Sequence, residues 1–125
     1  MADTKIFENG DKLRIVQELV PGRQITIAHI IANPEPILYQ KMGLDPKLDY
    51  THAAIGVMTI SPAETAVIAA DIAMKSSNIE LGFVDRFSGT LIITGLVADV
   101  ESSLTAVTAY FRNTLKFSVC DVTKT

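Results

Sequence analysis

Hydrophobic and polar positions in the first half of the chain predict two strands and one short helix. Residues 13–20 and 25–31 are rich in β-branched and other apolar residues, which favours strands, and a Pro-Gly pair separates them. The second run is almost continuously apolar, as expected of a strand inside a sheet. A helix is predicted over residues 35–42 because a glycine follows it, and residues 45–52 read as a polar loop.

From residue 53 onward the pattern predicts the order strand, helix, strand, strand, helix, strand. The expected strands cover residues 54–60, 79–85, 90–94 and 117–123. This βαββαβ order is typical of an α+β, ferredoxin-like sandwich, in which an antiparallel sheet carries both helices on one face. The opposite face of such a sheet needs a cover of its own.

Both long helices have recognisable starting signals. Ser61-Pro62-Ala63-Glu64 offers an N-cap serine, a proline at the first helical position and a glutamate that would complete a capping box. Asp99 is expected to cap the second helix. The predicted buried face of the first helix is formed by Ala63, Ala66, Val67, Ala70, Ala73 and Met74, and that of the second by Val100, Leu104, Val107, Phe111 and Leu115.

Length and composition favour one domain that associates with copies of itself. The chain has 125 residues, of which 48% are hydrophobic and 20% charged, so apolar surface should remain after one small core is filled. No apolar stretch approaches the roughly 20 residues that span a bilayer. The polar residues 1–12 lack the apolar segment of a signal peptide, so we expect a flexible arm on a cytosolic protein.

Charge and cysteine usage exclude several other classes. The net charge is −3 and the 11 Lys and Arg residues are scattered, which argues against binding to nucleic acid. Cys120 is the single cysteine, so no internal disulfide can form, and its apolar surroundings favour a buried structural thiol.

A polar interruption, Asp85-Arg86-Phe87-Ser88-Gly89, separates two apolar strands and could be catalytic, phosphate-binding or part of a passage between subunits. Ser88 and Asp85 with His29 or His52 would supply a triad, but the glycine pattern of a nucleophile elbow is missing. Neither a phosphate-binding glycine motif nor metal-ligand spacing is present. We therefore expect no catalytic residue, metal or cofactor, and the residues alone indicate a hairpin tip with an Asp85–Arg86 ion pair.

Three blocks of the sequence resemble a known family. "IVQELVPGRQITIAHIIANP", "ISPAETAVIAADIAMKSSNIEL" and "GFVDRFSGTLIITG" occur in this order and are similar to the bacterial microcompartment (BMC) shell proteins. The similarity is to the circularly permuted subgroup typified by the ethanolamine- and propanediol-utilisation shell proteins, and it extends from Arg14 to the C-terminus.

The resemblance implies a structural tile and not an enzyme. Residues 13–125 would form one permuted BMC domain, with elements that usually end the chain moved to its front. Six copies would form a hexamer, and hexamers would pack edge to edge with other shell proteins around encapsulated enzymes in the bacterial cytoplasm. No nucleic acid, membrane or cofactor is implied.

The resemblance also assigns roles to individual residues. Lys75 and Asn78 match the hexamer edge, whereas Asn33 falls where many unpermuted tiles have arginine, so that contact must differ here. Asp85, Arg86, Phe87, Ser88 and Gly89 match the pore loop, where a ring of phenylalanines would constrict the passage. The residues that match a strand of a six-stranded axial barrel, which would cap one mouth of the pore, are Arg14, Ile15, Val16, Gln17, Glu18, Leu19 and Val20.

Two readings remain beside the tile. The βαββαβ order fits equally well a regulatory domain that dimerises through its sheet and binds a small molecule. The segment 14–20 could also pair as an edge strand within its own subunit. A solution mass separates a hexamer from a dimer.

Overall fold

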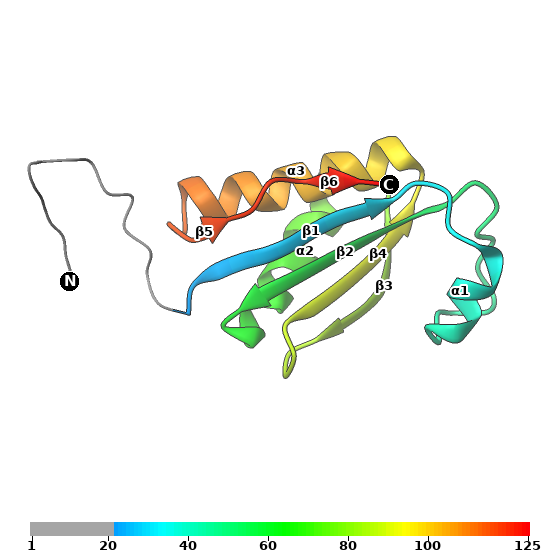
Figure 1. Cartoon of the computed structure of the whole chain (residues 1–125), viewed down its shortest axis with the longest axis horizontal. Helices are drawn as coiled ribbons and strands as arrows, with labels where there is room; N and C mark the ends of the chain where they lie inside the picture. Colours follow the sequence, from blue (N-terminus) through cyan, green and yellow to red (C-terminus); the bar gives the residue numbers. More distant parts are fainter. Residues whose placement is uncertain (1–21) are drawn as a thin grey trace, which may run out of the picture.

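The computed structural model describes residues 22–125, and Figure 1 shows one twisted sheet with two long helices along it. The predictions for residues 1–12 and 13–20 lie outside the described residues. The elements are β1 (Gln24–Ile31), α1 (Pro36–Lys41), β2 (Ala54–Ser61), the 3₁₀ turn η1 (Ala63–Thr65), α2 (Ala66–Ser76), β3 (Glu80–Asp85), β4 (Thr90–Gly95), α3 (Val97–Asn113), β5 (Ser118–Val119) and β6 (Thr123–Lys124).

The βαββαβ order is present as β2-α2-β3-β4-α3-β5, but the sheet is not purely antiparallel. Its strand order is β3-β4-β2-β1-β5, with β6 also paired to β1. β1 pairs antiparallel with β2 and parallel with β5 and β6, so it is inserted between the first and last strands of the βαββαβ unit. The strand predicted over 117–123 is divided into β5 and β6, which pair with β1 at residues 24–25 and at residues 29–30.

The main core lies between the sheet and the two helices α2 and α3. Its largest fully buried side chains include Phe111, Met58 and Leu104. The face of α2 that meets the core is built from alanines, namely Ala66, Ala69, Ala70 and Ala73. The prediction that Val67 and Met74 belong to this face was wrong, because both side chains are about half exposed on the outer side of the helix.

Both predicted helix caps were also wrong. Ser61 pairs with Gln24 as the last residue of β2, so it stays in the strand and cannot form a capping box. η1 follows, and α2 begins only at Ala66, with no side-chain bond at its N-cap. α3 begins at Val97, so Asp99 lies within its first turn, where a carboxylate still interacts favourably with the helix dipole.

Among residues 22–125, the opposite face of the sheet is covered only at one end. Tyr39 of α1 and Leu44 pack there against Ile55 and Ile92 in a second, smaller cluster. Figure 1 shows α1 beyond this end of the sheet, away from the hairpin of β3 and β4. No other described element packs on this face, where Ile27 is 47% and Phe83 39% exposed.

Candidate functional site

The predicted edge and loop residues within 22–125 lie at two opposite ends of the sheet. At one end the register aligns Glu80 with Thr94, Thr94 with Ile55, and Ile55 with Ile31. Asn78 and Asn33 flank this row in the sequence. At the other end Asp85 pairs with Thr90, and Thr90 with Thr59, so the loop 85–89 lies a full strand length away.

The Asp85 carboxylate organises the loop between β3 and β4. Its Oδ1 accepts a hydrogen bond from the backbone N–H of Phe87 at 2.8 Å, and its Oδ2 accepts one from Ser88 Oγ at 2.9 Å. These bonds favour the ionised form, so they lower the pKa of Asp85, with the Phe87 N–H as the largest cause. The acid therefore fixes the backbone of the turn.

Gly89 joins the loop to the end of β2. Its φ is +79°, its N–H donates to Asp85 O at 2.8 Å, and its carbonyl accepts from Ile60 N–H at 2.8 Å. A Cβ at this position would lie 2.1 Å from Ile60 O, which is far inside van der Waals contact. Glycine is required both by the conformation and by the close approach.

Arg86 and Phe87 are presented outward from this fixed backbone. The Phe87 side chain is 82% exposed, and the Arg86 guanidinium carbon lies 5.0 Å from the centre of its ring, within cation–π distance. The predicted Asp85–Arg86 ion pair was wrong: in the described part of the chain, Asp85 bonds to Phe87 and Ser88 instead. Val67, Phe83 and Phe87 also line a shallow cleft of about 600 Å³ beside the loop.

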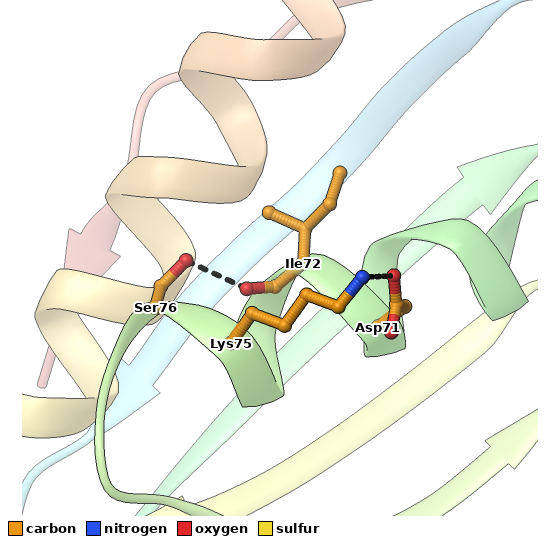
Figure 2. Close-up of polar contacts among 4 residues, drawn as sticks. All are labelled: Asp71, Ile72, Lys75 and Ser76. Carbon is orange, nitrogen blue, oxygen red and sulfur yellow. Dashed lines mark hydrogen bonds and ion pairs between the residues drawn. The ribbon is translucent and has the colours of Figure 1, made fainter.

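Lys75 and Asn78 lie at the C-terminal end of α2, and both are exposed. Figure 2 shows Lys75 Nζ paired with Asp71 Oδ2 one turn earlier, at 2.8 Å, and Ser76 Oγ donating to the carbonyl of Ile72 at 2.6 Å. The hydrogen bond to Asp71, and then its charge, raise the pKa of Lys75. The ammonium group is thus charged and held along its own helix.

A serine network under this edge was not predicted from the sequence. Ser103 of α3 is fully buried and donates through Oγ to the carbonyl of Ala73 at 2.8 Å. Ser77 Oγ lies 2.7 Å from Ser103 Oγ and donates to the carbonyl of Asp99 at 2.6 Å. The bonds join the last turn of α2 to α3. The sequence did contain a signal for this network, because Ser103 occupies a position where the helix periodicity requires an apolar residue.

The residues considered for catalysis do not assemble. His29 Nδ1 and Nε2 lie 2.6 and 2.9 Å from the hydroxyls of Thr123 and Thr125, so the ring joins β1 to the C-terminal segment. Ser88 Oγ donates to Asp85 Oδ2 at 2.9 Å and lies 3.1 Å from Thr90 Oγ1, so its hydrogen bonds go to these two residues and not to an imidazole. His52 lies on the loop before β2 at a φ of +62°.

Metal and thiol chemistry find little support in residues 22–125. No group of three or more His, Cys, Asp or Glu side chains that could hold a metal ion occurs among them. Cys120 is partly buried, and desolvation is the main cause that raises the pKa of its thiol, which makes the thiolate scarce. No helix in the described range has the length and apolar character needed to cross a membrane.

Comparison with known proteins gives consistent matches. The family model described as "BMC domain" matches residues 54–122. The bacterial microcompartment shell protein CutR of Streptococcus intermedius is 48% identical over 119 residues, which cover 95% of this chain and 98% of the relative. The shell protein PduU of Salmonella typhimurium is 46% identical over 112 residues, 90% of this chain and 93% of the relative.

A solved structure agrees with these sequence matches. The structure titled "CutR flat hexamer, form 1" superimposes with a TM-score of 0.76 at 47% sequence identity, and the match covers 90% of this chain and 99% of that one. At this identity the likeness extends beyond a shared fold.

Proposed function

Since this chain belongs to the BMC-domain family of bacterial microcompartment shell proteins, we propose that it is a structural tile of such a shell and assembles as a homohexamer. The observation that carries the proposal is the near full-length match, at 47% identity, to a protein solved as a flat hexamer. The regulatory-domain reading is not favoured, because the family model, the relatives and the solved structure named above are those of shell proteins.

The exposed apolar side chains support self-association. Val67, Ile68 and Met74 lie on the outer side of α2, and Phe83 lies on the edge strand β3. A monomer would leave these side chains in water, together with the outer edge of β3, which pairs with no other described strand. A closed ring in which one flank of each subunit meets the opposite flank of the next would bury them.

The circular permutation also forms part of the proposal. β1, the first described strand, fills a sheet position between the first and last strands of the βαββαβ unit. In unpermuted tiles, a strand near the C-terminus would occupy this position. In this chain, β1 would occupy it instead, although β1 precedes the βαββαβ unit in the sequence. Residues 14–20, which precede it, would then be available for the six-stranded axial barrel.

We assign the loop 85–89 to the six-fold axis, with a constricted pore. Six copies of Phe87, each 82% exposed on a hydrogen-bonded turn, would bring six rings and six Arg86 side chains together. A hexamer structure tests this assignment. We expect no axial opening that passes a small aldehyde through both loop and barrel, and an open passage of that width would contradict it.

At the opposite end of the sheet, Lys75, Asn78 and Asn33 would meet neighbouring hexamers. All three are exposed, and the Lys75 side chain is 74% exposed beside its ion-pair partner Asp71. Asparagine at position 33 would make a shorter contact than the arginine of unpermuted tiles. This edge would contact other shell proteins. The surface of the tile would contact encapsulated enzymes, and the tile would lie in the microcompartment shell.

The tile would act without catalysis of its own, since the candidate catalytic side chains are committed to structural hydrogen bonds. Its test is a solution mass followed by electron microscopy of the purified chain. We expect a mass of six subunits and extended sheets or closed shells. A stable dimer whose melting temperature rises with a small metabolite would support the regulatory domain instead.

A further inference from the structure

A second cleft lies far from the loop 85–89, at the end of the sheet that α1 covers. Its volume is about 890 Å³, within the range of small-molecule sites. α1, the chain leaving β1 and the segment before β2 enclose it, and Figure 1 shows these parts together beyond the end of the sheet. Its lining includes Pro34, Tyr39, Leu44, Asp49, Tyr50 and His52.

Two stacked tyrosines set the hydrogen-bonding character of this cleft. The rings of Tyr39 and Tyr50 are nearly parallel, with centroids 4.4 Å apart. Tyr39 donates its hydroxyl proton to the carbonyl of Ala53 at 2.7 Å, and Tyr50 donates its own to the carbonyl of Asp45 at 2.9 Å. Since each phenol has one proton, both oxygens can only accept further hydrogen bonds.

The charge of the cleft agrees with this character. Hydrogen bonds from Thr51 lower the pKa of Asp49, so its carboxylate stays ionised. Burial, followed by the charges of Asp45 and Glu80, raises the pKa of Tyr50, which indicates a negative field at the phenol. None of the described residues that line the cleft is Lys or Arg.

We propose that this cleft binds a small protonated primary amine. The ammonium group would donate to the Asp49 carboxylate and the phenol oxygens, while its alkyl part would lie against Pro34 and Leu44. An anion would meet the Asp49 charge, with His52 the one basic side chain among the described lining residues, and a neutral alcohol would lack the charge interaction. The site is separate from the proposed pore, and it borders the proposed edge, since Asn33 is also among its lining residues.

Three probes of similar size test the charge requirement on the full chain at fixed ionic strength: n-butylammonium, 1-butanol and butyrate. The chain has no Trp and 3 Tyr, so tyrosine fluorescence reports on the cleft, and Tyr110→Phe removes the one tyrosine outside it. We expect saturation by n-butylammonium with a Kd of about 1–10 mM, as fits a ligand of few atoms, and at least about fivefold weaker binding of the other two.

Asp49→Asn provides the matching variant, because the amide oxygen can still accept from Thr51 while the charge is lost. It should weaken n-butylammonium binding at least about fivefold. Glu64→Gln, which removes an exposed acid of η1 that does not line the cleft, should leave the affinity unchanged. Equal binding of the three probes, no saturation by n-butylammonium, or an Asp49→Asn affinity equal to that of the wild type would overturn the proposal.

Discussion

The two ends of the sheet are built on opposite principles. At the hairpin end, the backbone of residues 85–89 is fixed by an aspartate, a glycine and a bond to β2, and the side chains of Arg86 and Phe87 are left to project. At the opposite end, which contains Lys75, Asn78 and Asn33 and is called the Lys75 end, the helix α2 supplies the backbone. There Ser103 of α3 donates a hydrogen bond to the carbonyl of Ala73 in α2, and Asp71 forms an ion pair with Lys75 on the surface of the same helix.

At each end, different residues determine the course of the backbone and the contacts made by the exposed side chains. The hairpin would keep its course with other side chains at positions 86 and 87, because neither makes the bonds that form the turn. The Lys75 end would keep its shape without Lys75, but only while α2 stays attached to α3. Backbone changes should therefore be most damaging at the hairpin, and side-chain changes should act mainly on what each end contacts.

Gly89→Ala should have the largest effect on the subunit. The new Cβ would lie 2.1 Å from Ile60 O in a conformation with φ of +79°, so the turn and its bond to β2 must both be displaced. We expect a loss of about 3 kcal/mol or more in the free energy of unfolding. Denaturant unfolding at a fixed protein concentration measures this loss.

Gly43→Ala is the matched control for that substitution. Gly43 has a similar φ of +72°, but no atom lies within 4 Å of a Cβ built there. The conformational cost alone is about 1–2 kcal/mol. Equal losses for the two variants would show that the contact with Ile60 does not matter, and the hairpin end would then be less rigid than described.

Ser103→Ala should have the next largest effect, now at the Lys75 end. It removes the donor to Ala73 O and one partner of Ser77 inside a fully buried site. Loss of such a bond costs about 1–3 kcal/mol. Ser102→Ala, at the exposed neighbouring position, should change stability by less than about 0.5 kcal/mol. If the two variants are equally stable, the serine network does not hold α2 against α3.

Much of the fold could be predicted because the hydrophobic patterns were local. The strand before residue 32, the helix near residues 36–41 and the β3–β4 hairpin all follow from such patterns. The insertion of β1 beside β5 could not be predicted, since strand pairing between residues about 90 apart leaves no local signal. At Ser61 a local signal was present but misleading. The sequence predicted a helix cap, whereas Ser61 pairs with Gln24 in the sheet.

The candidate sites were predictable in a similar, partial way. The loop 85–89 was located as an interruption between strands, but its internal bonds were not, because Asp85 could bond to the adjacent arginine or to the backbone ahead. The backbone prevails since an Asx-type turn satisfies two donors at once. The amine cleft was missed entirely, because its tyrosines come from two segments whose contact only folding creates.

Asp85→Asn should have a smaller, pH-dependent effect on the hairpin. Because the folded pKa of Asp85 is lowered from its ordinary value of about 3.9, the ionised carboxylate stabilises the folded state above that pH. This contribution is lost as the pH falls through the lowered pKa. The stability difference between wild type and variant should be constant near neutral pH and shrink below about pH 4. A difference that does not change with pH would show that the charge has no part in the turn.

Lys75→Ala should change subunit stability least, because its pair with Asp71 joins side chains that are 74% and 60% exposed and such exposed pairs contribute little. Assembly should respond differently: hexamers should form, while sheets seen by electron microscopy should be lost. Lys41→Ala is the matched control, since Lys41 also lies in the last turn of a helix and is exposed. If both variants form normal sheets, the contact between hexamers does not depend on Lys75. If neither variant forms sheets, the overall surface charge controls assembly. The difference between the two ends of the sheet would then apply to subunit stability and not to assembly.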